Sequence, residues 1–385
     1  MHSPEEKLID ILKDAGVTIA CTLPCDRIKT LIALLADTYG HSSLHYIPLT
    51  REEEGVGICA GAALAGKRSA MFFQNSGLGN MINALLSLTG FYKLPLALFI
   101  SHRGVYKEKI AAQAPMGDKL PGLLRGAGIR FTNINAVEDF SLIGEKLRRI
   151  YRNSEIHAFL LSPAVWEGSP ADAGLPALLT PRGNVTHCTA SSGPRPVLRP
   201  RLTRFGILET ISPFLEGKAV VCNLGVPAKE LFSIKHRTSH FYMLGSMGMV
   251  TPLGLGISLT TDKDVVVIDG DGSILMNPGS LATVAALSPR NLTIVAIDNG
   301  AYGSTGNQPT YASTCVDLEL VARGFGIRET LRVATKEQLR AALKASTKGP
   351  RFIHVLALPG NANVPNIPLD RLEIKKQMQD FLKDG

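Results

Sequence analysis

The chain has 385 residues, 45% of them hydrophobic, and a formal net charge of +8. It is therefore long enough for two globular domains of ordinary size. No apolar run approaches the length of a membrane span and the N-terminal residues lack a signal-peptide pattern, so we expect a cytoplasmic protein without membrane partners. The basic residues carry no interleaved aromatic residues, which argues against a nucleic-acid surface and leaves small anions as partners. The six scattered cysteines are typical of reduced thiols.

The two halves of the chain predict the same order of elements. The first half begins with an amphipathic helix over 5–15 and a strand over 17–23, and the second half begins with a helix over 204–215 and a strand over 219–224. Further on, a strand–helix–strand pattern starting at Ser69 matches another that starts at Val265, a shift of 196 positions (265 minus 69). We therefore predict two similar α/β domains, each a doubly wound parallel sheet.

The segment 166–200 is rich in Pro, Gly, Ser and Thr and has little periodicity, which is typical of a linker between domains. A group of arginines that extends from the middle of the chain to Arg204 indicates a solvated linker as well. The predicted domains are then 1–165 and 201–385.

Polar residues follow two strands of the second half. One strand ends in Gly270-Asp271-Gly272, and the next ends in Asp298-Asn299. Carboxyl ends of parallel strands meet at one sheet edge, where open α/β sheets bind ligands. A carboxylate oxygen, an amide oxygen and nearby backbone carbonyls suit Mg²⁺ that shares ligands with a diphosphate, and the glycines let the backbone approach the phosphates.

A simpler interpretation of the same residues stays open, and another fails on its residues. Most Asp-Gly turns bind nothing, so the chain would then be a regulatory α/β protein with a vestigial site. An EF-hand loop that starts at Asp269 would need a glutamate at its twelfth position, which is Ser280 here.

The two polar clusters resemble the fingerprint of thiamine-diphosphate (ThDP) enzymes, in which Gly-Asp-Gly is followed just under thirty residues later by an asparagine. Here Asp271 and Asn299 are 28 positions apart (299 minus 271), and Asp298 stands where the family has a first asparagine. The resemblance implies a pyrimidine-binding (PYR) domain over 1–165, a diphosphate-binding (PP) domain over 201–385, and no middle domain. It also implies that Asp271, Asn299 and Ala301 bind Mg²⁺, and that Gly270, Asp271, Gly272, Ser273, Asn299 and Ala301 bind the cofactor.

The resemblance also implies a catalytic glutamate in the first half, at the start of a small-residue helix and nine positions before a glycine. Counting back from Gly61 selects Glu52, with Glu53 and Glu54 as alternatives. Bound to N1′ of the aminopyrimidine, such an acid favours the imino tautomer that takes the proton from C2. The simpler interpretation is that three acids complement the dipole of the helix.

The string Gly245-Ser246-Met247-Gly248 is similar to a further element of the family. By that resemblance the carbonyl of Gly245 accepts the 4′-amino group, Met247 imposes the bent cofactor conformation, and Ser246 belongs to the same cofactor-binding loop. The alternative for Met247 is a place in the core.

Segment by segment, the chain resembles the sulfopyruvate decarboxylase family, with its two subunits fused. The strings that carry this resemblance are Thr50-Arg51-Glu52-Glu53-Glu54-Gly55, Gln74-Asn75-Ser76-Gly77-Leu78-Gly79-Asn80, Ser101-His102-Arg103-Gly104, Ala112-Gln113-Ala114-Pro115-Met116-Gly117, Gly270-Asp271-Gly272-Ser273 and Asp298-Asn299-Gly300-Ala301-Tyr302-Gly303-Ser304-Thr305-Gly306-Asn307-Gln308. The implied reaction converts 3-sulfopyruvate to sulfoacetaldehyde and CO₂, a step towards coenzyme M. Phosphonopyruvate decarboxylase is the second candidate, and a ThDP carboligase the third.

The substrate is a small dianionic 2-oxo acid, so its site needs cationic or amide donors. Arg103 suits a bidentate grip on the sulfonate or carboxylate, and Asn75, Asn80 and Lys109 are weaker candidates. Gln113 is both a weaker substrate candidate and our second candidate for a catalytic residue. Each of these side chains could instead lie at the surface or cap a loop.

The family resemblance also predicts self-association. Its cofactor lies between the PYR domain of one subunit and the PP domain of another, so we expect a homodimer or tetramer with active sites between subunits.

Overall fold

The computed structural model describes residues 2–37, 44–171, 197–345 and 348–383, and it divides into two units, Met1–Val185 and Thr186–Gly385. The division falls inside the predicted linker, most of which lies outside the described residues. The described residues at the start of that segment lie against the first unit: Trp166 packs on its core, and the Ser169 hydroxyl donates to Glu5. The domain boundaries stay a prediction.

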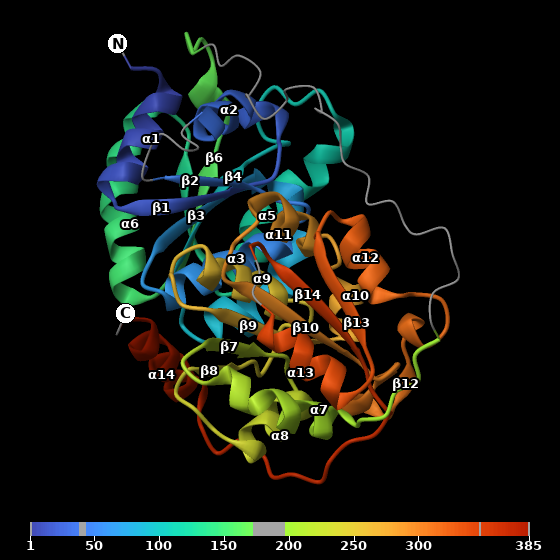
Figure 1. The fold of residues 1–385 in the computed structure, drawn as a ribbon. Coiled ribbons are helices and arrows are strands. Elements are labelled where there is room, and N and C mark those ends of the chain that lie inside the picture. Colours follow the sequence, from blue (N-terminus) through green and yellow to red (C-terminus); the bar gives the residue numbers. More distant parts are fainter. Residues whose placement is uncertain (1, 38–43, 172–196, 346–347, 384–385) are drawn as a thin grey trace. The chain divides into compact units, whose positions relative to one another are not determined.

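Within the described residues, the first unit is built on a six-stranded parallel sheet with the order β2-β1-β3-β4-β6-β5 (Figure 1). The strands are β1 Val17–Thr22, β2 His45–Pro48, β3 Arg68–Gln74, β4 Leu96–Ser101, β5 Arg130–Ile134 and β6 Ile156–Leu161. The helices are α1 Pro4–Asp14, α2 Lys29–Asp37, α3 Glu52–Leu64, α4 Leu78–Ala84, α5 Ala114–Gly126 and α6 Ser141–Asn153.

The second unit is built on a six-stranded parallel sheet with the order β13-β14-β10-β9-β7-β8, beside a small hairpin of β11 and β12. The strands are β7 Ala219–Cys222, β8 His240–Tyr242, β9 Val265–Gly270, β10 Leu292–Asp298, β11 Ala301–Tyr302, β12 Gln308–Pro309, β13 Glu329–Val333 and β14 Arg351–Leu356. The helices are α7 Arg204–Ile211, α8 Val226–Ile234, α9 Val250–Ser258, α10 Asp271–Met276, α11 Ser280–Leu287, α12 Leu318–Gly324, α13 Lys336–Lys344 and α14 Arg371–Lys383.

The two sheets have the same topology. Taken from its other edge, the second order becomes β8-β7-β9-β10-β14-β13, and each of these strands has its counterpart in β2-β1-β3-β4-β6-β5. The first strand of each unit therefore occupies the same position in its sheet, and the same holds for the other five strands of each sheet. This confirms the predicted fold class of two similar doubly wound parallel sheets.

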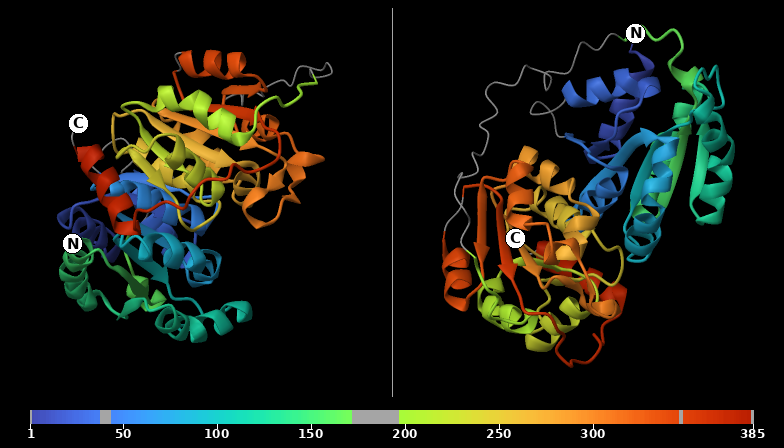
Figure 2. Two further views of the ribbon diagram at one scale, coloured as in Figure 1. Left: turned by 90° about the horizontal axis from the view of Figure 1, so that it is seen from below. Right: turned by 90° about the vertical axis from the view of Figure 1, so that its right-hand side faces the viewer.

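Helices cover both faces of each sheet (Figure 2). Every residue of β4 is buried, and successive residues of β9 from Val265 to Ile268 are buried as well. Because neighbouring residues of a strand point to opposite faces, such runs require cover on both sides. In the first unit, Phe72, Phe99 and Phe159 stack across three adjacent strands, with ring centroids 4.8 Å apart in each pair.

Local signals in the sequence account for the ends of several helices. Ser3 caps α1 and forms a reciprocal capping box with Glu6, and Pro4 occupies the first turn, where its missing N–H costs nothing. Thr335 and Gln338 form the same box at α13. Helix α3 begins at Glu52, so the predicted catalytic glutamate lies at a helix N-terminus, as expected.

Two general expectations are tested on the described part of the chain. No helix in that part has the length and hydropathy to cross a membrane. Cys21, Cys25, Cys59, Cys222 and Cys315 are free thiols there, and Cys188 lies outside the described residues.

Candidate active site

A pocket in the second unit lies at the carboxyl ends of β7, β9 and β10. From β7 the chain leads to β8, and from β9 it leads to β10 in the opposite direction along the sheet, so the strand order reverses here, at the switch point where open α/β sheets bind ligands. The pocket is lined by residues that follow each of the three strands, including Asn223, Leu224, Pro227, Met247, Gly270, Asp271, Gly272, Ser273, Asn299, Ala301, Tyr302, Gly303, Ser304 and Thr305. Most of the predicted cofactor residues are therefore brought together at one edge.

Three oxygen atoms meet at this edge without hydrogen bonds among them. The side-chain oxygen of Asn299 lies 3.3 Å from Asp271 Oδ1 and 2.8 Å from the carbonyl oxygen of Ala301, while it accepts from the Ala301 N–H at 3.3 Å. With the amide turned so that its NH₂ group faces these two oxygens, Asn299 donates hydrogen bonds to both, and with its oxygen facing them the three oxygens form a donor set for a cation. Neighbouring ligands of octahedral Mg²⁺ are about 3 Å apart, since each lies about 2.1 Å from the ion. The predicted donor set thus fits Mg²⁺.

A hairpin completes the surroundings of Asp271. The residues after Asn299 form β11, which pairs antiparallel with β12, and the Gly300 carbonyl accepts from Thr310 N at 2.9 Å. The returning strand brings the Thr310 hydroxyl to Asp271 Oδ2, to which it donates a hydrogen bond. Gly300, with φ of +66°, makes the turn into this hairpin. The string 298–308, singled out by resemblance, therefore forms a lid over the carboxylate.

Gly272 is required by the close approach of this hairpin. A Cβ atom on Gly272 would lie 2.2 Å from Cε1 of Tyr302, so any larger residue would displace the ring. The 245–248 loop approaches from the other side, where Gly248 N donates to Ser273 Oγ at 3.1 Å. Met247 lines the pocket as predicted, whereas Gly245 and Ser246 precede it in the loop and do not. The predicted roles of these residues toward the cofactor stay predictions.

The carboxylates of this edge are buried. Burial raises the pKa of Asp271 to about 6, opposed by the Thr310 hydrogen bond and assisted by the charge of Asp298. Burial also raises the pKa of Asp269 to about 6. Asp298 Oδ2 lies 2.8 Å from His354 Nε2, and His354 Nδ1 lies 3.4 Å from Asp317 Oδ1. Both carboxylates raise the pKa of His354 against the opposing effect of burial.

The three glutamates at the start of α3 have different surroundings. Glu52 is buried, accepts from Asn80 Nδ2 at 2.9 Å, and packs against Gly77, where a Cβ would lie 2.2 Å from its Oε1. Glu54 accepts from the hydroxyl and the N–H of Thr50, four residues earlier in the chain. Burial raises the pKa of Glu53, which faces Arg51. Glu52 is therefore held by Asn80 of helix α4.

The predicted substrate residues lie around the carboxyl ends of β3 and β4. Arg103 is buried, and Glu108 takes its guanidinium in a two-pronged ion pair with two N···O distances of 2.6 Å. Glu108 raises the pKa of Arg103, and Arg103 in turn holds the pKa of Glu108 well below its ordinary value. Glu108 uses Nε and Nη2, while Nη1 donates to Gln74 Oε1 at 3.4 Å, so a substrate anion would bind at Nη1 or take the place of Glu108. The substrate role of Arg103 stays a prediction.

The remaining candidates are partly gathered. Asn75 is buried and donates to the Arg103 carbonyl at 3.0 Å, but its own side-chain oxygen has no hydrogen-bond partner among the residues that the structure describes. Gln113 accepts from Gln74 at 3.1 Å beside this group, while Lys109 is exposed. Asn80 does not join them, because its amide is used by Glu52.

Sequence reasoning missed several residues of the pocket in the second unit. Asn223 follows β7 and could have been found by the rule that selected Asp271 and Asn299, since it too is polar and follows a strand. Thr310 carries no such signal. Arg204 was wrongly included with the solvated arginines: it is buried and paired with Glu230 at 2.7 and 3.0 Å. It begins α7, and the carboxylate inside the fold compensates its charge.

Comparison with known proteins gives the class. Residues 4–119 match the model of the thiamine pyrophosphate enzyme N-terminal TPP binding domain, and residues 222–355 match that of its C-terminal TPP binding domain. A putative thiamin diphosphate-dependent enzyme from Mycobacterium smegmatis, 15% identical, has the same fold with a TM-score of 0.68 over 93% of this chain and all of its own. The chain belongs to the thiamine pyrophosphate (thiamine diphosphate) enzyme family. The predicted family and cofactor are confirmed.

Several decarboxylases of this family are similar to the chain over most of its length or over one of its halves. A sulfopyruvate decarboxylase of Methanosarcina acetivorans is 44% identical over 99% of this chain and 98% of its own. A phosphonopyruvate decarboxylase of Streptomyces viridochromogenes is 34% identical over 92% of this chain and 88% of its own. In Methanococcus maripaludis, sulfopyruvate decarboxylase subunit beta is 46% identical over 47% of this chain, and subunit alpha is 39% identical over 42% of it. These two cover 98% and 96% of their own lengths.

The raised pKa of Asp271 predicts how the cofactor-free protein responds to pH. Between about pH 4, the ordinary aspartate value, and about pH 6, the folded chain retains a proton that the unfolded chain has released. The stability of the apoprotein should therefore fall as the pH rises through this window. Asp271→Asn removes this contribution, so the apo variant should exceed apo wild type at pH 8 by on the order of 1–3 kcal/mol.

Urea unfolding of both apoproteins at pH 4 and pH 8 measures this difference, which should vanish at pH 4. With ThDP and Mg²⁺ added at pH 8, the order should reverse, since only wild type retains its metal ligand. Equal apo stabilities at pH 8 would contradict the burial argument.

Proposed function

We propose that this chain is a ThDP- and Mg²⁺-dependent decarboxylase that converts 3-sulfopyruvate to sulfoacetaldehyde and CO₂, a step towards coenzyme M. The observation that carries the proposal is the 44% identity to a sulfopyruvate decarboxylase along nearly the full length of both chains. Asp271, the Asn299 side chain and the Ala301 carbonyl lie at one edge of the pocket, which supports the proposal because carboxylate, amide and carbonyl oxygens are the ligands that Mg²⁺ prefers. Phosphonopyruvate decarboxylase is the second candidate, favoured by a relative of 34% identity.

In the proposed site, Asp271 Oδ1, the Asn299 side-chain oxygen and the Ala301 carbonyl would hold Mg²⁺, which in turn would hold the diphosphate. Gly272 leaves room for the Tyr302 ring beside this carboxylate, and the Thr310 hydrogen bond fixes the Asp271 carboxylate. Met247, which lines the same pocket, would support the rings of the cofactor. Thiamine diphosphate supplies the carbon nucleophile and the electron sink that the 20 amino acids lack.

Glu52 would hold a proton against N1′ of the aminopyrimidine. It is buried, and Asn80 holds one of its oxygens. Asn80 is then a positioning residue and not a substrate ligand. Gln113 remains the second candidate for a catalytic residue, and its hydrogen bond with Gln74 would hold it near the substrate residues.

Arg103, Asn75 and Lys109 would bind the two anionic groups of the substrate. The buried side-chain oxygen of Asn75 without a partner marks a place where a donor is missing, and a buried acceptor of this kind costs about 1–3 kcal/mol. Arg103 would exchange Glu108 for the sulfonate or carboxylate of the substrate, one anion for another, so its charge would stay compensated throughout.

A decarboxylation assay that offers sulfopyruvate, phosphonopyruvate and pyruvate side by side, with ThDP and Mg²⁺, tests the proposal. We expect kcat/KM for sulfopyruvate to exceed that for pyruvate by at least about 10²-fold, since a lost anionic contact costs several kcal/mol. A preference for phosphonopyruvate would select the second candidate. Condensation of the product with an added aldehyde would indicate a carboligase. If the protein neither turned over a substrate nor bound ThDP, its site would be vestigial.

A matched pair of glycines tests the role of Glu52. Gly77→Ala would place a methyl group 2.2 Å from Glu52 Oε1, whereas Gly79→Ala, two residues later, meets nothing within 4 Å. Because a displacement near 1 Å in a catalytic group costs about 10²-fold in rate, kcat should fall by about that factor in the first variant and stay within about twofold in the second. Thermal unfolding of both variants would show that each folds. Equal activities would remove Glu52 from the reaction.

The proposed assembly is a homodimer or tetramer in which Glu52 of one chain and Asp271 of another serve the same cofactor. In its support, the relatives from Methanococcus maripaludis are named as subunits and each covers less than half of this chain. Proteins of this kind act as complexes of more than one chain, and the fused chain would associate with copies of itself.

Mixing two inactive variants tests whether the sites lie between chains. When equal amounts of the Glu52→Gln and Asp271→Ala variants exchange subunits at random, one half of the dimers contain one chain of each variant. Each mixed dimer then has one site in which both Glu52 and Asp271 are intact. About a quarter of wild-type activity should therefore return. Sites within single chains would give no recovery. Glu52→Gln mixed with itself under the same exchange conditions is the control.

A further inference from the structure

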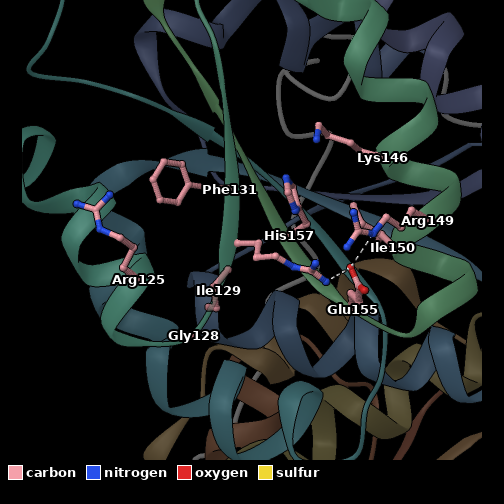
Figure 3. A pocket seen from close by; sticks show the side chains of 10 residues that line it. Arg125, Gly128, Ile129, Phe131, Lys146, Arg149, Ile150, Glu155 and His157 are labelled. Carbon is pink, nitrogen blue, oxygen red and sulfur yellow. Dashed lines mark ion pairs between the residues drawn. The ribbon is translucent and has the colours of Figure 1, made fainter.

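A cavity of ≈ 480 Å³ lies at the edge of the first sheet, far from the predicted catalytic edge. It is lined by the end of α5, the start of β5, the middle of α6 and the start of β6 (Figure 3). Its residues are Arg125, Gly128, Ile129, Arg130, Phe131, Lys146, Arg149, Ile150, Glu155 and His157. Its volume lies within the range of small-molecule sites.

The cavity carries an excess of positive charge. Arg125, Arg130, Lys146 and Arg149 face a single carboxylate, Glu155, which pairs with Arg130 at 2.5 Å and with Arg149 at 3.6 Å. Four cations and one anion leave a formal charge of +3 (4 minus 1). In the part of the chain that the structure describes, neither Lys146 nor Arg125 forms an ion pair. The described carboxylates therefore do not neutralise this group of cations, and an anion in the cavity would be attracted to it.

His157 shows that the positive field reaches the floor of the cavity. The imidazole is buried, and its Nε2 lies 2.8 Å from Thr132 Oγ1. Burial, together with the charges of Lys146, Arg130 and Arg149, lowers the pKa of His157 to about 4. Figure 3 shows Lys146 and Arg149 projecting from α6 on the side of the cavity where this ring lies. Near pH 7 the neutral ring can meet a ligand without adding a fifth charge.

The same cavity has an apolar wall. Ile129 and Ile150 are buried beside it, and Phe131 lies under the guanidinium of Arg125, 5.8 Å from its ring centroid. A flat aromatic ring of a ligand could lie along Phe131 while an anionic group meets the cations. Ile129 and Ile150 are already almost fully buried, so the half-buried Phe131 offers the apolar surface that the body of an organic anion would cover.

The cavity is separate from the place proposed for catalysis. Arg130 begins β5 and Glu155 precedes β6, so the cavity lies at the amino ends of these strands, whereas Arg103 follows the carboxyl end of β4. A strand of six residues spans about 20 Å. A ligand in this cavity would therefore not touch the substrate residues.

We propose that this cavity binds a phosphomonoester with an aromatic or apolar body. Such a group carries between one and a half and two negative charges near pH 7, which matches the excess of cations better than the single charge of a sulfonate or carboxylate. Lys146, Arg149 and Arg130 would bind the phosphate, and Ile129 and Phe131 the body. The proposal does not depend on the reaction proposed above.

Calorimetric titration of the protein, saturated with ThDP and Mg²⁺ so that its diphosphate site is filled, tests this inference. AMP is the probe, adenosine the uncharged control and inorganic phosphate the control without an apolar body. We expect AMP to bind saturably at one site per chain with Kd below about 1 mM, phosphate to bind at least about tenfold more weakly, and adenosine not to bind.

The variant Lys146→Gln/Arg149→Gln should raise the Kd for AMP at least about tenfold. Arg148→Gln removes the same charge from the same helix outside the cavity and should bind as wild type does. Lys146→Arg/Arg149→Lys keeps the charges and should retain binding within about threefold, which separates loss of charge from damage to the fold. Absence of saturable AMP binding, or equal binding by the double Gln variant, would overturn the site. AMP no tighter than phosphate would overturn the role of the apolar wall.

Discussion

The register between two parallel strands determines the chemistry of the second unit. Gly270 of β9 lies beside Ile297 of β10, and β10 continues only to Asp298, so the two strands end nearly level. Asp271 and Asn299 are the first residues after these strands. Their oxygens then meet although they are 28 positions apart in the chain. A slip of one residue would turn Asp271 to the other face and separate it from Asn299. The metal site proposed here therefore depends on backbone hydrogen bonds that lie several residues inside the core.

The two units share one topology but place different groups at their carboxyl edges. In the second unit the polar residues follow β7, β9 and β10, and a hairpin covers them. In the first unit the corresponding edge holds Glu52 at the start of α3, and Arg103 with Glu108 after β4. One scaffold thus provides an oxygen-lined pocket for a metal and a diphosphate in one copy, and acidic and amide groups in the other. This division of work agrees with membership of the thiamine pyrophosphate enzymes.

Much of this arrangement was accessible from the sequence because it is local. Strand ends, glycines and the spacing of Asp271 and Asn299 are patterns within short segments, and the repetition of elements predicted two similar sheets. The contacts that could not be predicted join distant segments. The Thr310 hydrogen bond to Asp271 depends on the hairpin, the Arg204–Glu230 pair depends on how α7 packs on α8, and Glu108 occupies Arg103 through the path of a loop. A sequence shows that a cation is present but not which carboxylate lies beside it.

Helix α3 contains Gly55, Gly57 and Gly61, and all but one of its residues are buried. A helix so rich in glycine has little tendency to form by itself, and one that is buried all round gains its stability only when every neighbour is in place. Glu52 is the first residue of this helix. A partly folded chain would therefore lack a correctly placed acid even if its metal pocket were complete, and chains that have not finished folding would hold the cofactor without using it.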